Sequence, residues 1–590
     1  MSHLEIIEMT FSLLAWIGKK LAADKSQRCP RNKKLEKSSK SKPSWFTRKE
    51  DKMSEGRELW KKYCGFFDKS FSEQVEYNER KKKEYFERWK KTKMAKQLCP
   101  EGVEKFEDIP LTTYDNYPIL HEFGKKIEKL EKTVPRGKKE LLCDYYDRIG
   151  RQASPMLDGW MVDDYGFCMK TSGTTGESKW FVFGDTFFKN MATDIMAILT
   201  LCCSDSWGET TLRKGDSVLN LMSSSPYSGG PFYRAVLNAG LRLVPPLSVT
   251  DNIPNMRKKI YLTLKMIEKG KSVDVAGGIA SSFHLICRYF TNRAGLYKDQ
   301  YQSMNLGVVK LVLFLRWLLQ RITGSDYKKV KDVMPVKGVG AGGFDTELYR
   351  DYLTDQFGRE PLNVYGTTDI GFPMMGLPDR RKSLMPDLRS GYFEFTENGE
   401  LVCRIDELKK MGVYGLIASP FGSMHIRYQI GDLFKVVDFR DDGLPIFEFE
   451  SRKSSLLDIY GWCRLSEAIA IEALKKAGLP PTDKWAFVKV IEPNEHLCLL
   501  MEKEWEHSEE KVAKLVFDSL KEIDVDFHHY VRHFKIKKVS DVIKVEYLKK
   551  GTFMRYVIKK SKEGVPLGQI KPPKLIPPER LEIVEMLKGA

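Results

Sequence analysis

The sequence predicts an α/β protein with a large N-terminal domain and a smaller α+β C-terminal domain. From about residue 165 to 365, short β-branched runs alternate with helical patterns, which is typical of a largely parallel sheet. Residues 392–450 contain many strand signals and few helix signals, and the residues after 452 mix the two. A length of 590 residues leaves room for two to four domains of about 150 residues each.

Residues 1–52 are predicted to form a basic, disordered extension. They hold thirteen Lys and Arg and six Asp and Glu, which gives +7 of the chain's net charge of +17. Residues 24–52 are rich in Lys, Ser, Arg and Pro without any period. Residues 6–21 are apolar and amphipathic but short for a membrane span, so a contact with a membrane surface through this extension stays open.

Residues 53–451 are predicted to form the large domain. Spaced aromatic residues in the Glu- and Lys-rich segment 55–95 indicate amphipathic helices. Residues 308–322 (VVKLVLFLRWLLQRI) contain three basic residues, so a core-packed helix is favoured over a span. Strands are expected at 217–222, 241–244, 273–276, 335–339 and 362–365, and helices around 235–239, around His284 and at 346–357.

The end of the large domain and the C-terminal domain have different patterns. Residues 392–450 are expected to form a small β-barrel or an antiparallel sheet. Residues 452–590 are expected to form a compact α+β domain. Its helices are predicted at 467–477 and 509–523, and its strands at 485–490, 497–501 and 534–539.

The strongest local signal for function is a run of hydroxyls and glycines at 171–179. Glycines let the backbone approach a phosphate closely, hydroxyls donate to its oxygens, and a lysine adds charge. The order differs from that of a Walker A loop, and a plain polar turn is the alternative. The candidate phosphate ligands are Thr171, Ser172, Gly173, Thr174, Thr175, Gly176 and Lys179.

Two segments farther along the chain complete the inventory of a nucleotide site. Tyr365, Gly366, Thr367, Thr368 and Asp369 end a predicted strand with an aromatic ring, two hydroxyls and a carboxylate. These groups suit an adenine ring, phosphate oxygens and a magnesium ion. Asp432 follows a glycine in another predicted strand, where its carboxylate can accept both ribose hydroxyls, and Arg452 precedes the C-terminal domain.

A glycine-rich run at 338–343 allows a different interpretation. It formally matches G-x-G-x-x-G, the fingerprint of a dinucleotide-binding oxidoreductase, after a predicted strand and before a helix. No acidic residue clearly ends the following strand to bind a ribose. Gly342 and Gly343 are therefore better assigned to an adenine pocket.

These segments, in this order and spacing, resemble the core motifs of adenylate-forming enzymes, and most of all the Gretchen Hagen family of acyl acid–amido synthetases. Three stretches carry the closer resemblance. They are residues 110–117 (PLTTYDNY), residues 427–432 (RYQIGD), and Gly551-Thr552-Phe553 followed by residues 567–574 (LGQIKPPK). The resemblance covers roughly residues 100–580.

The resemblance implies a large adenylate-forming domain, a C-terminal lid and a nucleotide bound between them, with ATP and Mg²⁺ as cofactors. It assigns ATP phosphates to Thr171, Ser172 and Thr174, and the ribose to Asp432. Asp369 takes the magnesium-ligand place, where the family usually has Glu. Arg464 stands where the family has a lysine, and Lys571 is the candidate lid lysine for the α-phosphate. Asp369, Arg464 and Lys571 are thus the expected catalytic residues.

The expected activity is ATP-dependent conversion of a carboxylic acid to an acyl-adenylate, followed by transfer to an amine such as an amino acid. An acyl- or aryl-CoA ligase of the phenylacetate type is the alternative enzyme. A membrane- or RNA-tethered binding protein with a degenerate nucleotide site is the alternative of another class, although no nucleic acid partner is expected. Eleven cysteines without a C-x-x-C pair favour reduced thiols and a cytoplasmic protein.

Overall fold

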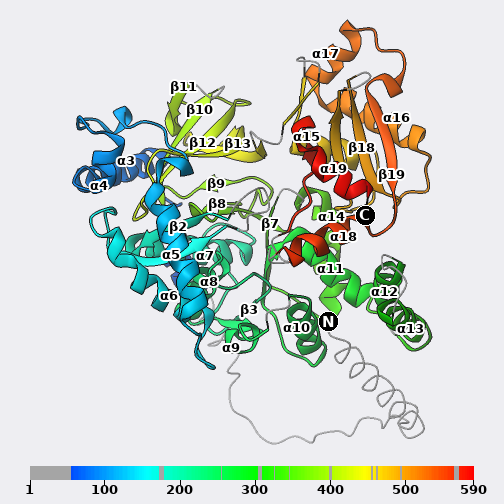
Figure 1. The fold of residues 1–590 in the computed structure, drawn as a ribbon, viewed down its shortest axis with the longest axis horizontal. Helices are drawn as coiled ribbons and strands as arrows, with labels where there is room; N and C mark the ends of the chain where they lie inside the picture. The colour runs from blue at the N-terminus through cyan, green and yellow to red at the C-terminus, as the bar shows by residue number, and fades with distance from the viewer. Residues whose placement is uncertain are drawn as a thin grey trace, which may run out of the picture.

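The computed structural model describes most of the chain beyond residue 54 (Figure 1). The described residues are 55–171, 178–253, 256–302, 308–324, 326–343, 346–397, 401–452, 456–459, 463–491, 495–563 and 570–589. The predicted disordered extension at 1–52, with its amphipathic segment 6–21, lies outside these residues, and so do residues 172–177 of the hydroxyl-rich run.

The amphipathic helices predicted near the N-terminus are present. Residues 55–63 are helical, and α3 (Phe71–Trp89) and α4 (Lys93–Leu98) follow. Ser70 caps α3 in a capping box with Glu73, and Thr92 caps α4, so each start is fixed by a side chain that accepts from a backbone N–H. Helices α5 (Pro118–Thr133) and α6 (Leu142–Ala153) come next.

A seven-stranded sheet forms the centre of the large domain, in the order β4-β3-β5-β6-β7-β8-β9. The first five strands are parallel, as the alternation of elements predicted, and β8 and β9 are antiparallel. The strands are β3 (Ser217–Leu219), β4 (Arg242–Val244), β5 (Val275–Ile279), β6 (Gly338–Gly342), β7 (Leu362–Thr367), β8 (Gly371–Met375) and β9 (Met385–Pro386).

Helices join the parallel strands and cover the sheet. The predicted helix 346–357 is α14 (Thr346–Phe357), and His284 lies in α11 (Ala280–Thr291). The others are α7 (Asp185–Cys202), α8 (Gly229–Asn238), α9 (Leu247–Thr250), α10 (Met256–Glu268), α12 (Arg293–Gln302) and α13 (Val308–Thr323).

The glycine-rich run 338–343 is mostly the strand β6 itself, not a loop between a strand and a helix. A Cβ atom on Gly338 would lie 2.5 Å from the carbonyl oxygen of Cys202, and one on Gly340 would lie 2.8 Å from the Cys202 sulfur. These glycines let the end of α7 press directly onto the sheet. The match to a dinucleotide fingerprint therefore has a packing cause, and the oxidoreductase alternative loses its only support.

Helix α13 differs from its prediction. The segment 308–322 is helical, but it is not packed in the core: Leu311, Leu315 and Ile322 are exposed. It packs mainly against α12, at the edge of the domain. A period of 3.6 shows that a helix has an apolar face, but it does not show that the fold covers that face.

Residues 391–452 form the antiparallel alternative of the two sheets that the sequence allowed. The order is β11-β10-β12-β13-β14, and all four pairings are antiparallel. The strands are β10 (Gly391–Glu397), β11 (Leu401–Arg404), β12 (Val413–Pro420), β13 (Tyr428–Phe439) and β14 (Pro445–Arg452). A separate hairpin, β1 (Tyr165–Lys170) with β2 (Trp180–Gly184), carries the hydroxyl-rich run at its tip.

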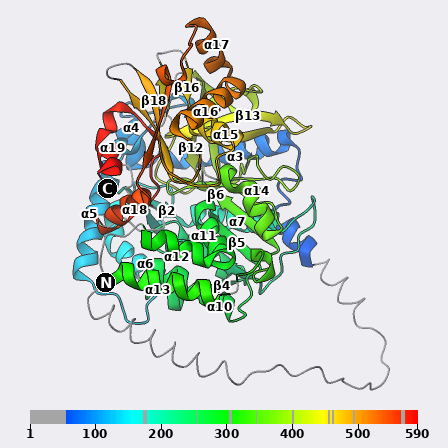
Figure 2. The same cartoon turned by 90° about the vertical axis from the view of Figure 1, so that its right-hand side faces the viewer.

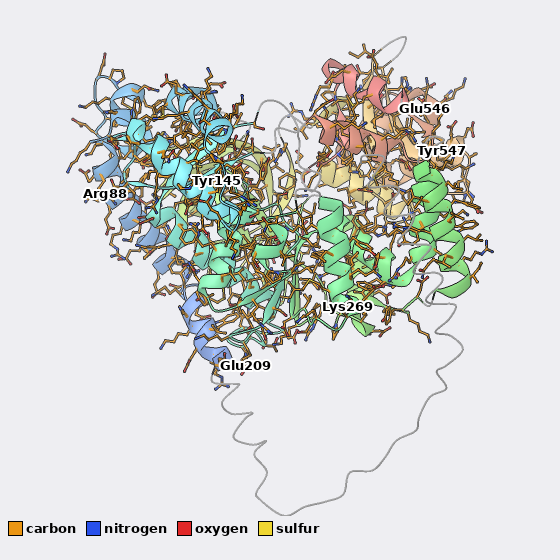
Figure 3. All side chains as sticks on the ribbon, turned by 60° about the horizontal axis from the view of Figure 1, so that its bottom comes forward. Arg88, Tyr145, Glu209, Lys269, Glu546 and Tyr547 are labelled. Atoms are coloured by element: carbon orange, nitrogen blue, oxygen red, sulfur yellow. The ribbon has the colours of Figure 1, made fainter. Side chains whose placement is uncertain are left out.

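The C-terminal domain contains a four-stranded sheet in the order β19-β18-β17-β20. Figure 3 shows its Glu546 and Tyr547 on the opposite side of the molecule from Arg88 and Tyr145 of the N-terminal helices. Its elements are β15 (Leu457–Ile459), β16 (Cys463–Leu465), α15 (Glu467–Lys476), β17 (Trp485–Val490), β18 (His496–Glu502), α16 (Glu509–Ile523), α17 (Val525–His533), β19 (Ile543–Leu548), α18 (Thr552–Lys562), β20 (Leu575–Ile576) and α19 (Leu581–Lys588).

The strand predicted at 534–539 is wrong. Asp524 caps the extra helix α17, which occupies the residues just before this segment, and Lys535 has a positive φ that interrupts an extended backbone. The strand of this region is β19, whose Ile543, Val545 and Leu548 are buried. Among the described residues, no helix is both long and apolar enough to cross a membrane.

Candidate functional site

The carboxyl ends of the parallel strands meet along one edge of the seven-stranded sheet. Strand β6 ends at Gly342, which pairs with Val364 of the neighbouring β7, and β7 ends at Thr367. Open parallel sheets bind ligands in the crevice outside this edge. Two groups predicted separately from the sequence, residues 342–343 and residues 366–369, are therefore neighbours at the edge where a ligand is expected.

Asp432 lies buried in β13 between two polar partners. Its Oδ2 accepts a hydrogen bond of 2.8 Å from the hydroxyl of Tyr365, and its Oδ1 lies 3.0 Å from Nε of Arg452. Asp432 and Arg452 pair directly across β13 and β14. Burial raises the pKa of Asp432, while the charge of Arg452 and the hydrogen bond from Tyr365 lower it. The carboxylate is thus held at a fixed position next to β7.

Tyr365 and Gly366 shape the end of β7. The Tyr365 ring is buried, with its centroid 4.8 Å from that of Phe434 and 6.3 Å from that of Phe449. A Cβ atom on Gly366 would lie 2.3 Å from the ring of Phe372, so no larger residue fits without moving β8. Tight packing of this turn aims the Tyr365 hydroxyl at Asp432.

Asp369 follows β7 and carries the second acidic group of the site. Its carboxylate accepts a hydrogen bond from the Thr367 hydroxyl, across the turn that contains Thr368. Burial raises the pKa of Asp369, and the hydrogen bond from Thr367 and the charges of Arg452 and Lys179 lower it. The Asp369 carboxylate therefore lies within the electrostatic reach of both the β1–β2 hairpin and the end of β14.

Two hydrogen bonds close the start of the loop that joins β1 to β2. The Thr171 N–H donates to the Lys179 carbonyl, and the Lys179 N–H donates to the Thr171 hydroxyl, each at 2.8 Å. The remaining predicted phosphate ligands, Ser172, Gly173, Thr174, Thr175 and Gly176, lie between these two residues and outside the described part of the chain.

The entry segment 110–117 ties this hairpin to β13. The Thr112 N–H donates to the carbonyl of Arg427, and the Gln429 N–H donates to the carbonyl of Thr112, each at 2.9 Å. The Tyr114 hydroxyl bonds the backbone of Trp180, and the Lys179 ammonium lies 5.0 Å from the Tyr114 ring centroid. Residues 112–114, 179–180 and 427–429, which are far apart in the sequence, are therefore in direct contact.

His425 and His284 are packing histidines. His425 Nε2 lies 2.6 Å from the carbonyl oxygen of Asp369, and its ring packs against Phe181. His284 packs against the rings of Tyr349 and Tyr352. Burial lowers the pKa of each histidine to about 4, so both imidazoles are neutral near pH 7.

The C-terminal domain brings charged groups to the same crevice. Glu467 begins α15 and is buried; burial raises its pKa to about 7, against the lowering effects of Lys574, Arg452 and Lys571. Lys571 is thus within electrostatic reach of Glu467 and the Arg452 end of the site. The Ser466 hydroxyl donates to Glu450 of β14 at 2.5 Å, which joins the two domains beside this group.

Arg464 is the predicted catalytic residue that the structure does not bring to this group. It lies exposed on β16, where it pairs with Asp458 across the β15–β16 ladder. Among the described residues, its side chain makes no ion pair or hydrogen bond with Asp432, Arg452 or Glu467. A different placement of the C-terminal domain is needed before Arg464 can reach the crevice.

The structure also supplies residues that sequence reasoning missed. Glu467 was predicted only as the start of a helix, and Lys574 only as part of the closing stretch, but both belong to the charged group at Arg452. Thr112 was not assigned any contact with β13. For Glu467, the available signal was an acidic residue at the start of a predicted helix. The contact of Thr112 with Arg427 joins residues more than 300 positions apart, so the sequence around Thr112 does not indicate it.

The acidic side chains of the site fit one magnesium ion that is held mainly by the phosphates of the nucleotide. Among the described residues, no three His, Cys, Asp or Glu side chains are grouped as a metal site would require. Mg²⁺ is usually bound through one or two carboxylates together with substrate phosphates, and dedicated protein cages are rare. Asp369, within electrostatic reach of Lys179, provides such a single carboxylate.

Comparisons with known proteins support the fold. No family model matches the chain. A jasmonoyl–L-amino acid synthetase, JAR4 of Nicotiana attenuata, is 26% identical over 223 residues, which are 35% of this chain and 37% of that relative. The match thus spans little more than a third of the relative's length.

Two solved structures of the acyl acid amido synthetase GH3.15 resemble most of the chain. One, in complex with 2,4-DB, has a TM-score of 0.57 at 16% identity and covers 86% of this chain and 91% of that one. The other has a TM-score of 0.58 at 15% identity and covers 94% and 97%. The chain therefore has the fold of this acyl acid amido synthetase, as the motifs predicted.

Proposed function

We propose that the chain is an ATP-dependent ligase that converts a carboxylic acid to its acyl-adenylate and transfers the acyl group to an amine. The observation that carries the proposal is the meeting of Lys179, Asp369 and the Asp432–Arg452 pair at the carboxyl edge of the sheet. The fold of an acyl acid amido synthetase and the partial match to a jasmonoyl–amino acid synthetase support the same class of reaction.

Each end of an ATP molecule has a counterpart in the crevice. The β1–β2 hairpin, with Thr171, Lys179 and the loop between them, binds the phosphates. Asp432 accepts the ribose hydroxyls, with Arg452 beside it, and the ends of β6 and β7, including Gly342, Gly343, Tyr365, Gly366 and Thr367, surround the adenine. Asp369 would hold Mg²⁺, which supplies positive charge to the phosphate oxygens when bound.

The first half-reaction needs alignment and charge but no protein nucleophile. An oxygen of the substrate carboxylate attacks the α-phosphorus, the bond from that phosphorus to the bridging oxygen breaks, and pyrophosphate leaves. Lys179 and Lys571 place positive charge where negative charge develops on the phosphates. The hydrogen bond from Tyr365 and the pairing with Arg452 favour the ionised form of Asp432 and orient it for the ribose.

The second half-reaction transfers the acyl group. The amine nitrogen attacks the acyl carbonyl carbon, the bond to the AMP oxygen breaks, and the amine loses a proton as the amide forms. We place the lid at residues 452–590 and the large domain at 53–451, with the pivot just after Arg452. Rotation of the lid between the half-reactions would exchange Lys571 for Arg464 at the crevice.

The free cysteines fit a reducing compartment, and we place the enzyme in the cytoplasm.

An exchange assay tests the first half-reaction. Wild-type protein should incorporate labelled pyrophosphate into ATP in the presence of a suitable acid from a broad panel. Asp432→Ala should reduce this exchange by about 100-fold or more, because a charged hydrogen-bond acceptor for the ribose is lost. Asp438→Ala is the matched control, since Asp438 lies on the same strand but pairs at the surface with Arg380 and Lys410.

The outcomes separate the proposal from its alternatives. Exchange by Asp432→Ala at the wild-type rate would contradict the site, and absence of exchange with every acid would favour a binding protein with a degenerate site. Once an acid is found, chromatography of the products with amino acids and with CoA identifies the acceptor. An acyl-CoA product in place of an amide would overturn the second half of the proposal.

A further inference from the structure

Helix α13 carries an apolar stripe on the outer surface of the large domain. Leu311, Leu315, Leu318 and Ile322 recur every three or four residues, so they share one face of the helix. All four are exposed, from 39% for Leu318 to 73% for Ile322. Figures 1 and 2 both show α12 and α13 at the periphery of the large domain, outside α11 and away from the sheets.

This stripe is unusual among the exposed apolar residues. Elsewhere in the described parts of the chain, large exposed apolar side chains occur about one to an element, such as Leu237 on α8, Leu401 on β11 and Val525 on α17. Scattered residues of that kind are normal on protein surfaces. A continuous stripe three turns long is the kind of surface that marks an interaction.

The charges of α13 indicate what kind of surface it meets. The helix contains Lys310, Arg316 and Arg321 and no acidic residue. Lys310 and Arg321 are eleven residues apart, about three turns, and each precedes a residue of the stripe, so both lie along the same flank. The Arg321 guanidinium lies 5.7 Å from the ring centroid of Trp317. Cations and an indole thus border the apolar stripe.

This arrangement fits a lipid interface. A helix that lies in the plane of a membrane buries its apolar face a short distance below the headgroups, and its bases stay at the level of the phosphates. The aliphatic stems of Lys and Arg can extend along apolar surface while their charges reach the headgroups. Tryptophan is enriched at the same depth. A folded partner would need a groove that accepts a convex helix, whereas a membrane needs only the stripe and its cationic border.

We propose that α13 docks the enzyme reversibly on membranes that contain anionic phospholipids. The apolar stripe enters the interface, and Lys310 and Arg321 face the lipid phosphates. The docking surface is separate from the nucleotide site and does not depend on the proposed reaction.

Flotation of the full-length protein with lipid vesicles tests the proposal. Wild-type protein should float with vesicles of phosphatidylcholine containing about one third phosphatidylserine, and much less with phosphatidylcholine alone. The variant Leu315→Asp/Leu318→Asp should reduce the bound fraction by about fivefold or more, because two charges enter the buried face. Leu401→Asp is the control, because Leu401 is an exposed leucine on a distant strand, and it should float like the wild type.

A second variant keeps the apolar stripe and changes its border. Lys310→Glu/Arg321→Glu should abolish the preference for phosphatidylserine, while its thermal unfolding should stay close to that of the wild type because both side chains lie at the surface.

Three results would overturn the proposal. The first is no flotation of wild-type protein with either vesicle. The second is flotation of both α13 variants at the wild-type level, which would locate any membrane contact elsewhere, for example in residues 1–52. The third is a change of the aspartate variant from dimer to monomer without a change in flotation, which would assign the stripe to a second copy of the chain.

Discussion

Two ion pairs around β13 share the same chemistry but differ in how completely they are enclosed. Arg427 donates from Nε and Nη2 to the two carboxylate oxygens of Glu394 at 2.9 and 2.8 Å, and its Nη1 bonds the carbonyls of Glu107 and Ile109. Both side chains of the Arg427–Glu394 pair are almost fully buried. Arg452, in contrast, meets Asp432 through Nε at 3.0 Å, and 44% of its side chain is exposed.

This difference divides the short motif 427–432 into two roles. Arg427 fastens the segment 107–112 to the antiparallel sheet and leaves nothing for a ligand to contact. Asp432, at the end of the same motif, and its partner Arg452 on the neighbouring β14 combine a buried carboxylate with an accessible guanidinium. The surroundings of the two arginines therefore assign Arg427 to the framework and leave Arg452 accessible for binding.

The largest expected effect separates the two arginines by stability. Arg427→Met should lower the free energy of unfolding by about 3–5 kcal/mol, because it leaves the buried Glu394 carboxylate without its partner. Arg452→Met should lower it by about 1 kcal/mol or less, since that arginine is half exposed. Urea unfolding followed by fluorescence measures both. Equal losses of unfolding free energy in the two variants would contradict the assignment of Arg427 to the framework and of Arg452 to binding.

The second prediction uses Glu467, which lies on the Arg452 side of the comparison. Burial raises its pKa to about 7 in the folded protein, from an ordinary value of 4.5. Between these values the folded state binds more protons than the unfolded state, so ionisation of Glu467 costs stability as the pH rises through this window, and the whole cost is present above pH 7.

Glu467→Gln should remove that cost. The free energy of unfolding of the variant, relative to that of the wild type, should rise by about 2 kcal/mol between pH 5 and pH 8. This is less than the full pKa shift would give, because the neighbouring basic side chains can move closer to the ionised Glu467. Urea titrations at the two pH values measure the gain. A constant difference between the two proteins across this range would show that Glu467 titrates normally.

The smallest effect concerns the hydroxyl that orients Asp432. Tyr365→Phe keeps the ring between Phe434 and Phe449 and removes only the hydrogen bond to the carboxylate. The loss of about 1 kcal/mol should raise the KM for ATP about fivefold, with little change in stability. Phe449→Leu provides a contrast, because it disturbs the ring packing and not the hydrogen bond. An unchanged KM in Tyr365→Phe would mean that Asp432 is positioned by Arg452 alone.

Local periodicity was enough to predict the elements whose surroundings agree with their pattern. The helix 346–357 and the strands of the parallel sheet followed from alternation. Residues 171–179, 365–369 and 432 could be proposed as site residues because each short run contains the chemical groups that a nucleotide needs. The strand predicted at 534–539 failed where Asp524 starts an extra helix. The prediction that α13 packs in the core was wrong, because the burial of a helix depends on which of its faces the rest of the fold covers.

The parts of the site that could not be predicted all depend on contacts between distant segments. Nothing near Thr112 indicates its pairing with Arg427 and Gln429. Gly338 and Gly340 of β6 belong to a run that matches a nucleotide fingerprint, and only the proximity of Cys202 shows that these two glycines serve packing. The exposed position of Arg464 likewise follows from the placement of the whole C-terminal domain.

Equilibrium binding of ATP and AMP by calorimetry tests most directly whether the hairpin and Asp432 hold opposite ends of one nucleotide. Lys179→Met should weaken ATP binding about tenfold and leave AMP binding within about twofold, since it removes one charge from the terminal phosphates only. Asp432→Ala should weaken both nucleotides by a similar factor of about ten or more, because each carries the ribose. Unchanged affinities in both variants, or a loss confined to AMP in Lys179→Met, would contradict a shared nucleotide site.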